Sequence, residues 1–103
     1  SLNDSHQDHN TVAMEAFRCF KKECSILGYE APCNNREFNF DFFCRLEKRH
    51  IEKKIKMLEF YKSQYILNRS YFSKEFIYSL AKVRGTQCNS KYAEVFEVIR
   101  WIK

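Results

Sequence analysis

Apolar residues recur at three- and four-residue spacing along most of this 103-residue chain, which is the period of an amphipathic helix. The first such segment predicts a helix from Thr11 to Leu27, with Asn10 as its N-cap and Gly28 just after its end. We expect residues 1–9, which are polar, to be frayed or disordered. The apolar stripe of this first helix is Ala13, Phe17, Phe20, Cys24 and Leu27.

Two further helices are predicted in the middle of the chain. Asn34 is followed three residues later by Glu37, which is typical of a capped helix start. The apolar positions of this second helix are Phe38, Phe42 and Cys44. We expect a break at Leu46–Arg49 and a third helix over about His50–Ser63. The shared face of the third helix is Ile51, Ile55, Leu58 and Tyr61.

The C-terminal third predicts two more helices. A turn over Tyr65–Arg69 precedes a helix that Ser70 or Ser73 caps and Gly85 ends. The apolar stripe of that helix is Phe76, Ile77, Leu80 and Val83. A last helix is predicted after Asn89. Its apolar positions are Tyr92, Val95, Phe96, Ile99 and Ile102.

The predicted fold class is therefore all-α, a compact bundle of about five short helices. The chain has only two glycines and one proline, which argues against a turn-rich β-sandwich or barrel. We expect residues 10–103 to form a single helical domain, with residues 10–28 as an extra N-terminal helix. No apolar run approaches the roughly eighteen residues of a membrane span, and no signal peptide is visible.

The chain is basic, with a net charge of +5. Much of this charge lies in Arg45–Lys56, where six Lys or Arg stand against two Glu. Such a run fits either a solvated helix face or a surface for nucleic acid, membrane headgroups or an acidic protein segment. Aromatic residues interleave with the cations just beyond, as in KKIKMLEFYKSQY, and could stack on bases, although they also coincide with the apolar stripe.

Five cysteines are present, which is many for a short domain. No Cys-x-x-Cys pair and no His at zinc-finger spacing occurs, so the pattern predicts no metal site. We interpret the cysteines mainly as reduced core thiols. A disulfide-stapled secreted protein is the alternative, because Asn3 and Asn68 begin formal glycosylation triplets. The five positions are Cys19, Cys24, Cys33, Cys44 and Cys88.

The sequence predicts neither an enzyme nor a cofactor. The two glycines are isolated at expected helix ends, so no glycine-rich phosphate loop exists. A nucleophile–base pair of Cys44 with His50 can be written down. The two residues lie six apart, however, which is off the spacing of one helix face, and we expect a core thiol and a surface imidazole instead.

Four segments from Arg45 onward match a known module in the order and spacing of Ile, Leu, Lys and Arg. They are RLEKRHIEKKIKML, EFYKS, FIYSLAKVR and VIRWIK. They resemble the integrase-binding domain of lens epithelium-derived growth factor (LEDGF), a relative of the TFIIS N-terminal domain. The resemblance covers residues 34–103 and implies a right-handed helical bundle that docks short disordered peptides in chromatin.

The resemblance also implies a peptide cleft between two interhelical loops. In the first loop, Leu46 would line the pocket and Glu47 would accept hydrogen bonds from the partner's backbone N–H groups. The second loop of the family carries an aromatic and a β-branched residue, whereas this chain has Arg84 to Cys88 without an aromatic. Basic residues would steer an acidic peptide. The predicted partner-binding residues are Leu46, Glu47, Lys48, Arg49, Arg84, Thr86 and Cys88.

The function predicted from the sequence is a non-enzymatic protein–protein interaction domain. It would dock short acidic or aromatic peptide motifs of nuclear or chromatin-associated partners, in the nucleus and away from membranes. Two alternatives stay open: a basic helical nucleic-acid-binding domain and a secreted, disulfide-stapled helical factor. Partner identity and oligomeric state do not follow from the sequence.

Overall fold

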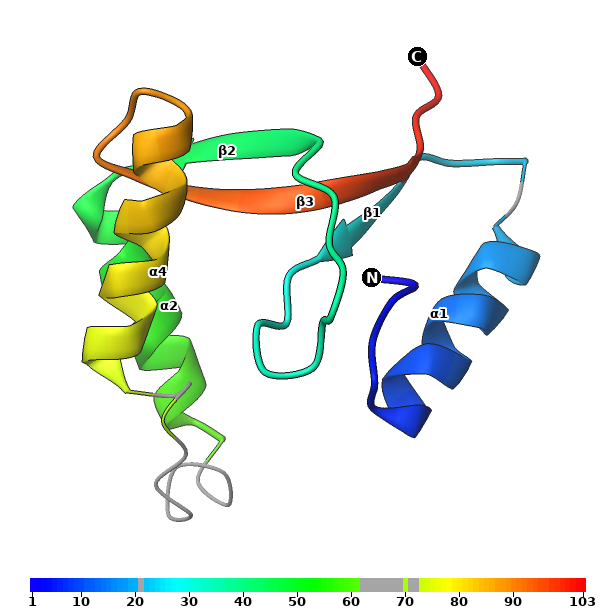
Figure 1. Cartoon of the computed structure of the whole chain (residues 1–103), viewed down its shortest axis with the longest axis horizontal. Coiled ribbons are helices and arrows are strands. Elements are labelled where there is room, and N and C mark those ends of the chain that lie inside the picture. The colour runs from blue at the N-terminus through cyan, green and yellow to red at the C-terminus, as the bar shows by residue number, and fades with distance from the viewer. Residues whose placement is uncertain (21, 62–69, 71–72) are drawn as a thin grey trace. The chain divides into compact units, whose positions relative to one another are not determined.

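The structure combines helices with a β-sheet, so the predicted all-α bundle of five helices is wrong. The computed structural model describes residues 1–20, 22–61, 70 and 73–103 (Figure 1). Within these residues the structure has three helices and three strands. In chain order they are α1 Gln7–Cys19, β1 Ile26–Tyr29, β2 Phe42–Leu46, α2 Lys48–Glu59, α4 Lys74–Gln87 and β3 Tyr92–Arg100.

The segment expected to form the last helix is strand β3, which is central in a three-stranded antiparallel sheet of order β1-β3-β2. Its apolar residues fit a helical period, but burial alternates along the segment, since Val95 and Glu97 are buried while Phe96 and Val98 are half-buried. β-Branched and aromatic residues pack well on a pleated surface, which favours the strand. The terminal helix that the LEDGF-like bundle implies is therefore absent from this segment.

The first two predicted helices are also corrected. Helix α1 begins earlier than expected, where the His6 ring accepts a hydrogen bond from the Asp8 N–H, and it ends at Cys19. The continuation expected to Leu27 is instead the strand β1, which pairs antiparallel with β3. The segment read as a second helix contains β2, whose Phe-Phe-Cys-Arg-Leu sequence has high β-propensity.

The third and fourth predicted helices are present as α2 and α4, although α2 begins at Lys48, inside the expected break, and ends at Glu59. The Ser73 hydroxyl caps α4 by accepting the Phe76 N–H at 3.1 Å, as the sequence predicts. Gly85 does not end α4 but lies buried within it. The two helices lie side by side (Figure 1). The turn expected at Tyr65–Arg69 falls outside the described residues. The core of this region is Ile51, Ile55, Ile77, Ala81 and Tyr92, with Leu46, Leu58 and Tyr78 packed against it.

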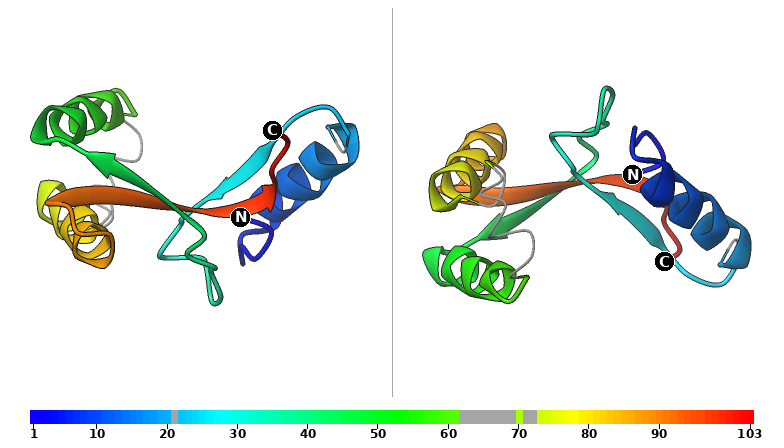
Figure 2. Two further views of the ribbon diagram at one scale, coloured as in Figure 1. Left: turned by 90° about the horizontal axis from the view of Figure 1, so that it is seen from above. Right: turned by 90° about the horizontal axis from the view of Figure 1, so that it is seen from below.

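The chain divides into two compact units. Unit 1 is Ser1–Phe42 together with Val95–Lys103, and unit 2 is Phe43–Glu94. In unit 1, α1 lies beside β1 and the C-terminal part of β3 (Figure 2). The N-terminal residues expected to be frayed contribute to this unit, since Asp4 forms a β-bridge with Asn35. Unit 2 contains the helix pair and its core.

Candidate functional site

Helix α2 is amphipathic, with a buried apolar face and a basic outer face. Ile51 and Ile55 are buried against α4. Arg49, Lys53 and Lys56 follow the i, i+4, i+7 spacing that places side chains on one face, and all three are exposed. At about 100° per residue, this face is opposite to the buried isoleucines. We call Arg49, Lys53 and Lys56 the basic stripe.

The cations of the basic stripe are available to a ligand. Arg49 Nε lies 3.0 Å from Glu47 Oε2, but both side chains are about 70 % exposed, so the pair is weak. Lys53 and Lys56 form no ion pair among the described residues. Lys54 points away from the stripe and pairs with Glu94 of β3. An anion that reaches the stripe therefore displaces little protein structure.

Exposed apolar side chains continue the outer face at the C-terminal end of α2. Phe60 is 82 % exposed and follows Lys56 by four residues, so it extends the same face. Tyr61 and Met57 beside it are also exposed. A phenyl ring held in water next to cations is a feature of surfaces that bind planar or anionic ligands.

Charge is unevenly divided between the two units. Unit 2 holds twelve Lys and Arg against five Asp and Glu, whereas unit 1 holds six against eight. The positive charge of the chain is therefore concentrated in the unit that carries the basic stripe. Such a concentration attracts polyanions over a distance and raises association rates.

The first loop of the predicted cleft joins β2 to α2. Leu46 is the last residue of β2 and packs against the core of unit 2. Glu47 is the N-cap of α2, and its backbone N–H donates to His50 Nδ1 at 2.9 Å. Lys48 and Arg49 are exposed in the first turn. The Glu47 carboxylate accepts from Arg49 Nε at 3.0 Å, so it already has a partner within the chain.

The second loop of the predicted cleft is the C-terminal end of α4. Thr86 donates from Oγ1 to a carbonyl within the helix, and the Arg84 guanidinium donates to Gln87. The Arg45 guanidinium donates to the Cys88 carbonyl oxygen from Nε at 3.2 Å and from Nη2 at 3.0 Å. These bonds join the end of β2 to the end of α4, so the two loops named from the sequence lie close together.

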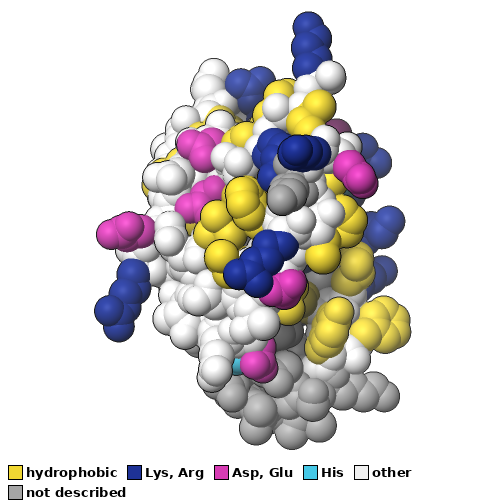
Figure 3. All heavy atoms as spheres, turned by 90° about the vertical axis from the view of Figure 1, so that its right-hand side faces the viewer, with side chains coloured by type: hydrophobic (Ala, Val, Ile, Leu, Met, Phe, Trp, Pro, Cys, Tyr) yellow, Lys and Arg dark blue, Asp and Glu magenta, His cyan; other side chains and the backbone are white. Residues whose placement is uncertain are grey.

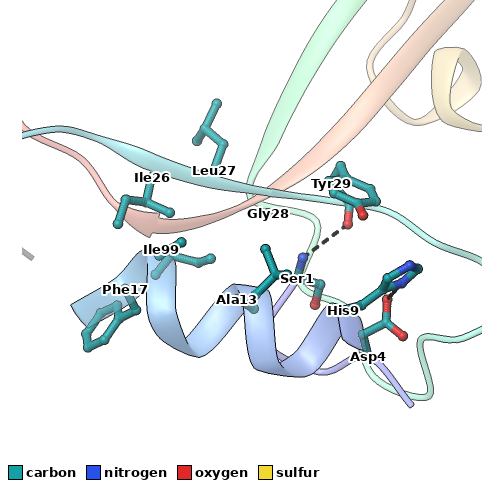
Figure 4. Close-up of a pocket in the computed structure, with 12 residues that line it drawn as sticks. Ser1, Asp4, His9, Ala13, Phe17, Ile26, Leu27, Gly28, Tyr29 and Ile99 are labelled. Carbon is teal, nitrogen blue, oxygen red and sulfur yellow. Dashed lines mark hydrogen bonds and ion pairs between the residues drawn. The ribbon is translucent and has the colours of Figure 1, made fainter. Parts of the chain in front are cut away.

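Unit 1 contains a pocket of about 230 Å³ that sequence reasoning missed (Figure 4). Its walls are mostly apolar side chains of α1, β1 and the end of β3, and Asp4 and His9 form its polar end. The Asp4 Oδ2 lies 2.9 Å from His9 Nδ1, and Oδ1 accepts the His6 N–H at 2.8 Å. The sequence signal was weak, because these residues precede the first apolar stripe.

The environment of Asp4 determines its ionisation. Burial by itself raises the pKa of the Asp4 carboxyl, but the hydrogen bonds from His6 and His9 and the charge of His9 outweigh burial. The net result is a lowered pKa. Asp4 is therefore a carboxylate over the whole physiological pH range.

Helix α1 has no buried residue, and several of its apolar side chains are exposed, among them Val12, Met14 and Phe20. Figure 3, which views the molecule from the α1 side, shows hydrophobic side chains at the surface among Lys and Arg side chains. The position of α1 thus depends on its limited contact with β1 and β3 along the pocket.

The cysteines do not form the expected buried set. All five are free thiols, and Cys19, Cys24 and Cys33 are exposed while Cys44 and Cys88 are half-buried. The interpretation of Cys19 and Cys24 as core residues is wrong, because α1 has no buried residue and Cys24 lies beyond its end. Among the described residues no three His, Cys, Asp or Glu side chains gather in a way that could hold a metal ion. In the same part of the chain, every helix is too short or too polar to cross a membrane.

Comparison with known proteins gave no match to a family model, a curated protein or a solved structure.

Proposed function

We propose that this chain binds nucleic acid through the outer face of α2, with the basic stripe contacting the phosphates. The observation that carries this proposal is the arrangement of Arg49, Lys53 and Lys56 on one exposed face of a helix whose opposite face is buried. Phosphate contacts by Lys and Arg release counterions and supply most of the non-specific affinity for nucleic acid. The concentration of positive charge in unit 2 supports the same ligand.

The exposed Phe60 ring adds a second kind of contact at the end of the stripe. Aromatic rings beside a basic surface stack on bases without sequence preference. Basic residues interleaved with aromatic ones therefore suit a nucleic acid better than they suit a purely apolar partner.

The test is the salt dependence of binding to a fluorescently labelled twelve-nucleotide strand, measured by anisotropy. A variant with Arg49, Lys53 and Lys56 all changed to Gln should bind more weakly. Its slope of log affinity against log salt should be smaller by about 2, because each lost phosphate contact on a single strand removes about 0.7. The matched control changes the exposed Arg18, Lys22 and Arg36 of unit 1 to Gln.

The control removes the same three charges, so net charge alone would affect both variants equally. A weaker affinity and a smaller salt slope in the stripe variant, but not in the control variant, support the proposal. Equal slopes for the two variants would mean that the stripe makes no phosphate contact and would refute it.

A second candidate is the docking of an acidic peptide between the two loops. It is favoured by one observation, the Arg45 hydrogen bonds to Cys88 that hold these loops together. An acidic peptide would meet Lys48 and Arg49 at the start of α2, while Leu46 would contribute apolar contact. A Glu47→Lys variant tests this candidate. The variant should alter the amount of such a peptide that is captured from cell extract. Nuclease treatment of the extract should leave the captured amount unchanged.

A further inference from the structure

Helix α2 carries exposed carboxylates on one side of the basic stripe. Glu52 and Glu59 are about two helical turns apart, so both lie on the same side of the helix. At about 100° per residue, this side lies between the basic stripe and the buried Ile51 and Ile55. Neither carboxylate forms an ion pair among the described residues. We call Glu52 and Glu59 the acidic flank.

The cations that an anion can reach on α2 are therefore confined to a narrow line along the helix. Lys48 lies on the side of the acidic flank, but only in the first turn, before Glu52. On the other side of the stripe, Lys54 is already paired with Glu94 of β3. Met57 on that side is apolar and 58 % exposed. A polyanion thus meets favourable charge along the stripe itself and not on both of its sides.

A duplex and a single strand place their phosphates differently around such a helix. A helix in the major groove of a duplex has a phosphate backbone on each side. One of these backbones would face the acidic flank, where like charges repel. A single strand has one backbone, which can follow the basic stripe without approaching Glu52 or Glu59. The charge pattern of α2 therefore favours the single strand.

The Phe60 ring favours the same ligand. Phe60 has α-helical backbone angles, so it continues the line of the stripe four residues after Lys56, and it is 82 % exposed. The bases of a single strand can stack on an aromatic ring that lies beside its phosphates. Bases in a duplex are already stacked on one another and do not reach such a ring. Phe60 therefore adds affinity only for a strand whose bases are accessible.

We infer that the outer face of α2 selects single-stranded nucleic acid over duplex. The acidic flank repels the second backbone of a duplex, and Phe60 stacks on a base of the single strand. This inference rests on the proposed function and narrows its ligand class. It assigns the selectivity to Glu52, Glu59 and Phe60, which lie outside the basic stripe.

The first test compares the affinity of the protein for two labelled ligands by fluorescence anisotropy at one salt concentration. The ligands are a twelve-nucleotide oligothymidylate and a twelve-base-pair duplex. Duplex DNA has the higher density of charge, so electrostatic attraction alone would favour the duplex. We expect the unmodified protein to bind the single strand more tightly instead.

A variant of the acidic flank should weaken this selectivity. With Glu52 and Glu59 both changed to Gln, we expect affinity for the duplex to rise about 5-fold or more, and affinity for the single strand to rise less. This difference follows because only the duplex places a backbone beside the flank. The matched control changes the exposed Glu23 and Glu37 of unit 1 to Gln, which removes the same two charges and should leave the ratio of the two affinities unchanged.

A variant of the ring gives a second, independent measurement. Phe60→Ala should weaken oligothymidylate binding about 5-fold or more, as expected for the loss of one stacking ring. Binding of the duplex and of an abasic strand of the same length should stay unchanged. The control is Val83→Ala, which removes an exposed apolar side chain of α4 and should change none of these affinities. Because Phe60 is almost fully exposed, its variant retains the fold, which circular dichroism checks.

The possible failures are distinguishable. If the duplex binds at least as tightly as the single strand and the flank variant leaves their ratio unchanged, the inference is wrong, while the proposed function stands as long as the stripe variant binds weakly. If no nucleic acid binds, both are wrong. A twelve-residue oligoglutamate peptide is the competitor. If it displaces the single strand at equal concentration, the stripe accepts any polyanion, and the inference is overturned.

Discussion

Asp4 is the residue whose environment makes the clearest prediction about pH. Its side chain is 3 % exposed and is held by His6 and His9, and its pKa in the fold is lowered. A lowered pKa means that the folded state prefers the ionised carboxylate more than the unfolded state does. The stabilisation is therefore fully present above the ordinary Asp pKa, near 4, and is lost as pH falls through the lower folded-state value.

We expect Asp4→Asn to lower the free energy of unfolding at pH 7 by about 1–2 kcal/mol, the typical cost of disrupting a buried hydrogen-bonded group. The difference between the two proteins should shrink as pH falls below about 4, because the wild-type carboxyl then becomes neutral as well. Urea unfolding of both proteins between pH 7 and pH 2 measures this. A difference that is constant across the range would show that ionisation of Asp4 does not stabilise the fold.

At the scale of elements, local signals were predictable from the sequence and long-range pairing was not. Helices α2 and α4 were predicted because Ile51 and Ile55 repeat at helical spacing and Ser73 provides a cap within the same segment. Strand β3 was missed because its apolar residues recur at helical spacing and do not alternate, whereas the strand depends on pairing with β1, which lies more than sixty residues earlier in the chain.

The same distinction applies to the candidate sites. The basic stripe was visible in the sequence as part of a charged run on a helix. The pairing of Tyr29 with Phe96 depends on the β1–β3 register, and the Asp4–His9 contact depends on where α1 begins. No spacing along the chain brings Tyr29 together with Phe96, so only the paired sheet could place them side by side.

Gly85 shows how an element boundary differs from its sequence signal. The sequence predicted that Gly85 ends α4, but the helix continues to Gln87, and the chain then turns back against Gly85. A Cβ on this residue would lie 2.6 Å from the Ser90 carbonyl oxygen and 2.7 Å from the Lys91 carbonyl carbon, both backbone atoms. The glycine is required for close packing between the end of α4 and the approach to β3.

We expect Gly85→Ala to lower the free energy of unfolding by about 1–3 kcal/mol, which is the usual cost of overpacking. An exposed mid-helix Gly→Ala change has the opposite sign and stabilises by about 0.5–1 kcal/mol. Chemical denaturation gives the sign directly, with Lys82→Ala on the exposed side of α4 as the control. A stabilised Gly85→Ala protein would contradict the close approach of the turn.

At the scale of the whole molecule, two properties separate the remaining functional hypotheses. Positive charge is concentrated in unit 2, and large exposed rings of unit 1 lie on one sheet face. A disulfide-stapled secreted factor requires neither feature, but it does require paired cysteines. The redox state of the five thiols therefore tests that alternative independently of any binding experiment.

We expect all five cysteines to titrate with Ellman's reagent after denaturation without reductant, because each is a free thiol. In the native protein the exposed Cys19, Cys24 and Cys33 should react quickly, and the half-buried Cys44 and Cys88 should react more slowly, since thiol reactivity follows access. Reductant should leave the melting temperature unchanged. Fewer than five thiols after denaturation, together with a melting temperature that falls in reductant, would support a disulfide framework and would contradict the structure. Full reactivity would leave the positive charge of unit 2 and the exposed rings of unit 1 as the features that any functional assignment must explain.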